Sequence, residues 1–95
     1  MKFNILKLEV KDLSGAIIPI NNAELGQLIG NYIYTTRSDL GWLEKAQAIY
    51  KGKTLELSEE DALQLSGIIS APEAGFTMAV KTALLEVLKN NTLEE

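Results

Sequence analysis

The sequence predicts an α+β fold in which an N-terminal antiparallel β-hairpin packs on a bundle of three to four helices. Apolar and polar residues alternate over residues 3–10, as they do in a half-buried strand. From about residue 23 onward, apolar residues recur at spacings of three and four, as they do in amphipathic helices. The chain of 95 residues has no internal repeat and no linker long enough to divide it, so residues 1–91 are predicted to form one domain.

The hairpin is predicted from two apolar segments and the turn between them. One face of the first strand carries three apolar side chains: Leu6, Leu8 and Val10. Residues 12–15 (Asp-Leu-Ser-Gly) supply the turn, because Asp accepts hydrogen bonds from the backbone ahead of it and Gly adopts positive φ without strain. Residues 16–20 return as the second strand. A possible short third strand near 54–57 is expected to extend this hairpin.

Helices are expected at about 23–35, 39–51, 59–69 and 74–89. The asparagine pair 21–22 and Ser38 are predicted to cap the first two, because short polar side chains accept hydrogen bonds from the free N–H groups of a first turn. Ser58 and Asp61 are spaced as a capping box for the third helix. Pro72 suits the first turn of the last helix.

The last helix is expected to form the centre of the core. Six apolar residues on it follow one another at spacings of four, three, one, three and one: Phe76, Val80, Ala83, Leu84, Val87 and Leu88. At about 100° per residue they occupy roughly a third of the helix circumference, so other parts of the chain must cover them. We call this face the seam of the last helix. Asn90 and Asn91 are expected to end this helix, and residues 92–95 are expected to fray.

Two glycines four residues apart, Gly26 and Gly30, lie on one flank of the first helix. Each costs about 1 kcal/mol relative to alanine. Close approach of another backbone to this flank would account for both, and two tolerated surface glycines are the equally weighted alternative. A membrane Gly-xxx-Gly motif is excluded, because the segment is too short and too polar.

Composition excludes several classes of function. The chain has neither cysteine nor histidine, so it lacks disulfides, thiolate metal sites and the commonest metal ligand. Nine Lys and Arg against 13 Asp and Glu give a net charge of −4, which argues against a duplex-binding surface. No apolar run approaches the roughly 20 residues that span a bilayer, and no signal-peptide pattern is present. The chain is therefore expected to be cytoplasmic and independent of membranes.

No group of residues has the pattern of a catalytic or cofactor site. A serine nucleophile needs a base, and the chain offers neither histidine nor a Ser-x-x-Lys pattern. Glu59, Glu60 and Asp61 point in three directions around a helix and complement its dipole, which makes them a poor metal site. Lys51-Gly52-Lys53 lacks the flanking glycines of a phosphate loop. The protein is predicted not to be an enzyme and to bind no metal or cofactor.

Two segments of the chain carry a resemblance: Val10-Lys11-Asp12-Leu13-Ser14-Gly15 and the run from Lys51 to Ala62 that contains the predicted capping box. They resemble segments of small uncharacterised bacteriophage and prophage proteins in which a hairpin precedes a few helices. The resemblance spans most of the chain. It implies an accessory or assembly role and carries over no catalytic residues.

Some apolar residues exceed what one buried face per helix requires. Met78 and Leu85, seven residues apart, lie nearly opposite the seam of the last helix. Trp42 and Ile49, also seven apart, lie beside the main stripe of the second helix, and Tyr34 shares the glycine flank of the first. That main stripe comprises Leu40, Leu43 and Tyr50. Such second faces indicate either a helix buried on all sides or a surface for a partner.

We therefore predict a non-enzymatic protein-interaction or assembly module, most simply a homodimer. Its candidate partner-binding residues are Tyr34, Trp42, Ile49, Met78 and Leu85. The alternative is a nucleic-acid-binding or transcription-regulatory protein. In that case the cations Arg37, Lys45, Lys51 and Lys53 would converge on one face.

Overall fold

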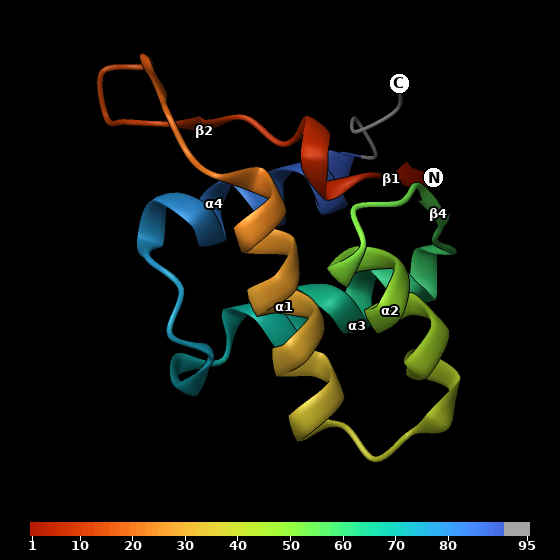
Figure 1. Cartoon of the computed structure of the whole chain (residues 1–95). Coiled ribbons are helices and arrows are strands. Elements are labelled where there is room, and N and C mark those ends of the chain that lie inside the picture. The colour runs from red at the N-terminus through yellow and green to blue at the C-terminus, as the bar shows by residue number, and fades with distance from the viewer. Residues whose placement is uncertain (91–95) are drawn as a thin grey trace.

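A computed structural model describes residues 1–90, which fold into four α-helices and two small antiparallel sheets (Figure 1). The α-helices are α1 (Asn22–Thr36), α2 (Leu43–Tyr50), α3 (Glu59–Ser70) and α4 (Met78–Asn90). The strands are β1 (Lys2–Phe3), β2 (Val10–Lys11), β3 (Ile17–Ile18) and β4 (Leu55–Glu56). Three 3₁₀ turns complete the order: η1 (Ile5–Lys7), η2 (Leu40–Trp42) and η3 (Pro72–Ala74). The predicted α+β class is confirmed.

The strand predicted over residues 3–10 is wrong, because a 3₁₀ turn divides it. The side-chain oxygen of Asn4 accepts a hydrogen bond from the Leu6 N–H at 2.9 Å and so caps η1. The side-chain amide of Asn22 at the start of α1 donates to the carbonyls of Ile5 and Leu8, each at 2.9 Å, which fastens η1 to this helix. Leu6 is consequently half exposed and does not face the core.

The two halves of this segment join different sheets. β1 pairs with β4, with Phe3 opposite Leu55, whereas β2 pairs with β3, with Val10 opposite Ile18. The third strand predicted near 54–57 exists as β4, but it pairs with β1 and not with the hairpin.

The turn of the β2–β3 hairpin forms as predicted. The Oδ1 atom of Asp12 accepts hydrogen bonds from the N–H groups of Ser14 at 2.9 Å and Ala16 at 3.0 Å. Gly15 has a φ of 93°, a conformation that only glycine adopts readily. These contacts hold the tip of the hairpin in one shape.

The flank of α1 that carries Gly26 and Gly30 packs against α2. A Cβ on Gly26 would lie 2.7 Å from the carbonyl oxygen of Ile49, and one on Gly30 would lie 2.8 Å from that of Ala46. The predicted close approach of another backbone is confirmed, and that backbone belongs to α2.

The second helix begins later than predicted. Asp39, and not Ser38, provides the cap: its Oδ1 accepts a hydrogen bond from the Gly41 N–H at 2.9 Å and begins η2, after which α2 runs for eight residues. Because Leu40 lies in this 3₁₀ turn, it is 82% exposed and does not join the predicted stripe. The capping box of α3 forms as predicted between Ser58 and Asp61.

The last helix also begins later, at Met78 instead of about residue 74. Gly75 adopts a left-handed conformation with a φ of 79°, which ends η3 and separates it from α4. The hydroxyl oxygen of Thr77 accepts a hydrogen bond from the Val80 N–H at 3.3 Å, as an N-cap does. Phe76 therefore precedes the helix, and its ring meets that of Tyr32 edge to face with centroids 6.2 Å apart. The predicted tail 92–95 lies outside the described residues.

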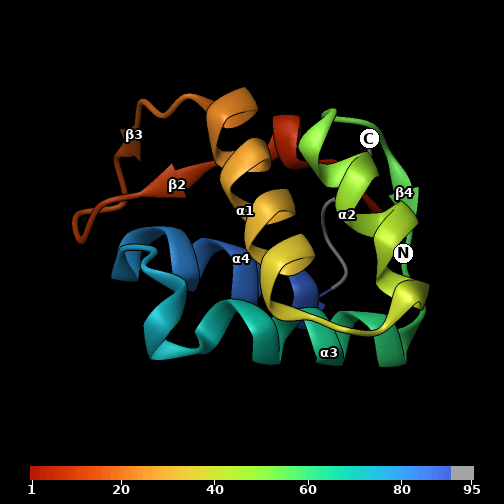
Figure 2. The same cartoon turned by 60° about the horizontal axis from the view of Figure 1, so that its bottom comes forward.

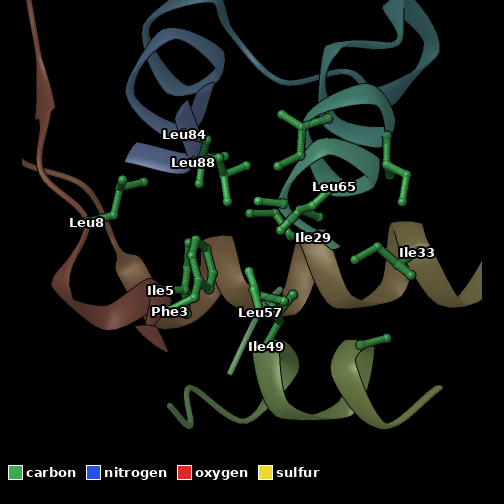
Figure 3. Close-up of a cluster of buried hydrophobic side chains, with 14 of the residues drawn as sticks. Phe3, Ile5, Leu8, Ile29, Ile33, Ile49, Leu57, Leu65, Leu84 and Leu88 are labelled. Carbon is green, nitrogen blue, oxygen red and sulfur yellow. The ribbon is translucent and has the colours of Figure 1, made fainter. Parts of the chain in front are cut away.

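The core lies where the four helices and η1 meet. α1 packs against α2, and α3 packs against α4 (Figure 2). Leu84 and Leu88 of α4 point toward Ile29 of α1 and Leu65 of α3, with Phe3 and Ile5 completing the cluster (Figure 3). The other four members of the predicted α4 seam are partly buried against this core. None of the described helices is both long and apolar enough to cross a membrane.

Candidate partner-binding groove

A groove of about 820 Å³ runs between the β2–β3 hairpin and α4. Its apolar lining comes from both sides: Leu13 and Ile18 of the hairpin, and Met78, Ala79, Ala83 and Val87 of α4. Charges of both signs border it: Lys7, Glu9, Lys11, Asp12 and Glu86. We call this surface the hairpin–α4 groove.

The groove exists because β2 is anchored while α4 presents small side chains beneath it. Val10 is buried, which holds β2 against α4. Ala79 and Ala83, four residues apart on α4, are only half-buried and leave an open floor. An apolar floor bordered by charge is what a protein surface needs to bind an apolar segment of a partner.

Met78 stands at the edge of this groove with 83% of its surface exposed. A methionine side chain adapts its shape to different partners, and methionine is enriched at protein interfaces. Of the five residues predicted to bind a partner, Met78 is the one that lines the groove. Leu85, predicted to share its face, is half-buried and does not line the groove.

Trp42 and Ile49 were wrongly predicted to lie at a partner surface. Trp42 is 3% exposed, and its indole Nε1–H donates a hydrogen bond to Oε1 of Gln64 on α3 at 2.8 Å. Ile49 is completely buried. The apolar side chains of residues 42–49 are therefore used within the domain. Gly26 and Gly30 let α1 pack closely on this segment, and Trp42 contacts Gln64 of α3.

Tyr34 lines a different and smaller pocket, which we call the corner pocket. It has a volume of about 80 Å³ and lies between the C-terminal end of α1 and η2. Its apolar lining includes Ile33, Tyr34, Leu40, Trp42, Leu43 and Ala46, and Arg37 and Asp39 stand beside it. The structure therefore separates Tyr34 from Met78. The helical patterns did not predict this pocket, because it depends on the 3₁₀ turn that exposes Leu40.

Of the four cations expected to converge for nucleic-acid binding, Lys45 makes several contacts within the domain. The Nζ atom of Lys45 donates to the carbonyl of Gly41 at 3.3 Å, lies 4.0 Å from Oδ1 of Asp61, and stands 5.2 Å from the centroid of the Trp42 ring. Lys45 is thus committed to contacts within the domain.

Across residues 1–90, no three acidic side chains gather in a way that could hold a metal ion.

Comparison of the chain with protein-family models, curated proteins and solved structures finds no match.

Proposed function

We propose that this protein is a non-enzymatic protein-interaction or assembly module and that its hairpin–α4 groove receives the partner. The observation that supports this proposal is the groove itself, which has an open apolar floor, an exposed methionine in its lining and charges of both signs around it. A phage or mobile-element origin, suggested by the resemblance of its turn and capping segments, fits an assembly role.

The simplest partner is a second copy of the chain in the cytoplasm. In a two-fold dimer the same patch meets itself, so a favourable patch must carry both charge signs. The lysines of the hairpin side and the carboxylates of Glu9, Asp12 and Glu86 meet that condition. A border of one sign would repel its own copy.

Light scattering on Met78→Glu tests this proposal. We expect the wild-type chain at tens of micromolar to have twice the monomer mass and Met78→Glu to be a folded monomer, because a charge at an exposed position costs little until a partner buries it. Leu63→Glu is the matched control, since Leu63 is also exposed, at 75%, but lies on α3 outside the groove. This control should remain dimeric. A monomeric wild type would refute the dimer, and a dimeric Met78→Glu would refute the groove as its interface.

A further inference from the structure

The tip of the hairpin presents an apolar side chain that nothing in its own domain covers. Leu13 is fully exposed, yet the turn that carries it is fixed by three hydrogen bonds to Oδ1 of Asp12. Two come from Ser14, from its N–H at 2.9 Å and its hydroxyl at 2.6 Å, and one comes from the Ala16 N–H. Because the turn is already fixed, its backbone loses little conformational freedom when a partner buries Leu13, and the entropy cost is confined to the leucine side chain.

Asp12 also leaves a charged acceptor beside this leucine. Within residues 1–90 all the hydrogen bonds to the carboxylate of this exposed residue reach Oδ1, which leaves Oδ2 available to a cation. The Ser14 hydroxyl holds the pKa of Asp12 below its ordinary value, and the carboxylate is therefore ionised at neutral pH.

The corner pocket has complementary features. Its volume of about 80 Å³ is about half of the ~150 Å³ cavity that admits benzene, and a leucine side chain has four carbons to benzene's six. Tyr34 and Leu40 flank it and are 65% and 82% exposed. Two charged residues also line it. The guanidinium of Arg37 makes no hydrogen bond or ion pair within residues 1–90, whereas the Oδ1 atom of Asp39 already accepts a hydrogen bond from the Gly41 N–H at 2.9 Å.

The β2–β3 hairpin lies toward the N-terminal end of α1 (Figures 1 and 2), whereas the lining residues place the corner pocket at the C-terminal end of that helix. Because a helix of 15 residues is about 22 Å long, one chain does not place its own Leu13 in its own pocket. The contact must therefore join two chains.

We propose that Leu13 of one copy enters the corner pocket of another, with Asp12 of the first against Arg37 of the second, so that copies associate head to tail. This inference rests on the proposed assembly function. Because Leu13 and Asp12 also line the hairpin–α4 groove, the groove contact and the head-to-tail contact are alternatives for any one hairpin tip. A head-to-tail contact leaves a free tip at one end and a free pocket at the other, so it extends into a ring or filament. A contact this small belongs to the weak class, with a Kd on the order of 1 mM.

The test is an NMR titration with two variants, one of which keeps only the corner pocket and the other only the hairpin tip. Both carry Met78→Glu, so that the groove contact is absent. The observed chain is ¹⁵N-labelled and carries Leu13→Ser, so it offers only a pocket. The unlabelled chain carries Leu40→Glu, so it offers only a tip. All three substituted positions are exposed, so every variant should fold. The indole N–H of Trp42, the one tryptophan of the chain, reports from the pocket wall.

Adding the unlabelled chain to about 2 mM should shift the Trp42 indole resonance toward saturation. The matched control, an unlabelled chain with both Leu13→Ser and Leu40→Glu, should leave it unchanged. Arg37→Gln in the labelled chain should weaken the shift several-fold. No shift with the tip-bearing chain, or an equal shift with the control, would overturn the head-to-tail contact. Because the groove is disabled in both chains, neither outcome bears on the groove dimer, which the Met78→Glu experiment decides separately.

Discussion

At the scale of single residues, the close contact between α1 and α2 depends on two glycines, which carry no side chain. Gly26 and Gly30 let the backbone of α1 approach the carbonyl oxygens of Ile49 and Ala46 on α2. The helix propensity lost at these two sites is about 1 kcal/mol each. The contact between α1 and α2 compensates for that loss.

Gly30→Ala is expected to destabilise the domain by about 1–3 kcal/mol, although alanine favours helix. The new Cβ would lie 2.8 Å from the Ala46 carbonyl oxygen and 2.9 Å from Cβ of Tyr50, and neither can move without moving α2. Gly67→Ala is the matched control, because Gly67 lies within α3 with nothing within 4 Å of a new Cβ. This control should gain about 0.5–1 kcal/mol. Urea denaturation of both variants gives the comparison, and a stabilised Gly30→Ala would contradict the tight crossing.

The turn at Asp12 makes a second prediction at the residue scale. The Ser14 hydroxyl, followed by the Ala16 N–H, lowers the pKa of Asp12 below 3.8. Because the unfolded chain then binds more protons, the contribution of this turn is fully present above about pH 4 and is lost as the pH falls through the folded pKa. Carboxyl NMR titration should show this depressed pKa, and Ser14→Ala should raise it toward the ordinary value. Ser66→Ala on α3 should leave it unchanged; an Asp12 pKa that is also unmoved by Ser14→Ala would refute the assignment.

At the scale of elements, the predicted seam of α4 contributes two buried leucines to the core. Leu84 is completely buried, and Leu88 is nearly so. Leu84→Ala should cost about 2–5 kcal/mol because it opens a cavity among α1, α3 and α4. Leu63→Ala on α3, at an exposed position, should change the stability by no more than about 0.5 kcal/mol. Equal urea midpoints for wild type and Leu84→Ala would show that the seam is not part of the core.

Patterns of apolar spacing predicted which helices form, and side-chain caps decided where they begin. The Ser58–Asp61 capping box could be predicted from the sequence, because both of its hydrogen bonds join residues three apart. The division of residues 3–10 into two strands could not be predicted, because the apolar alternation continues past Asn4. The hydrogen bond that Asn4 accepts and the two that Asn22 donates produce the 3₁₀ turn in spite of that pattern. Trp42 was misplaced for a related reason: its partner Gln64 lies 22 residues away in sequence, and spacing within one helix carries no information about it.

The candidate site was predictable only in part. Met78 was found because its position opposite the seam of α4 follows from helical spacing. The groove that it borders depends on where the hairpin lies over α4, which is a tertiary contact that no local pattern encodes. The corner pocket was missed because the exposure of Leu40 follows from the Asp39 cap, which converts a predicted helical turn to a 3₁₀ turn.

At the scale of the whole molecule, the distribution of charge separates the two classes of partner. The net charge of −4 gives a long-range field that repels polyanions. Of the four cations expected to converge, Lys45 is held by Asp61, the Gly41 carbonyl and the Trp42 ring. Among the described residues, four of the nine exposed large apolar side chains line the two surfaces: Leu13 and Met78 in the hairpin–α4 groove, and Tyr34 and Leu40 in the corner pocket. We therefore expect this surface to bind protein in preference to nucleic acid.

The chain should therefore bind duplex DNA no better than non-specific binding allows, with a Kd of about 10⁻⁴ M or weaker at roughly 150 mM salt. Fluorescence anisotropy of a labelled duplex measures this directly, and repeating it at lower salt tests the electrostatic origin of any residual binding. Binding that strengthens only slightly as salt is removed means that few phosphates are neutralised, because the slope against salt concentration counts them. Sub-micromolar binding with a steep slope would require a cationic face. In that case Arg37, Lys51 and Lys53 would be the residues to substitute first, since Lys45 is already engaged within the domain.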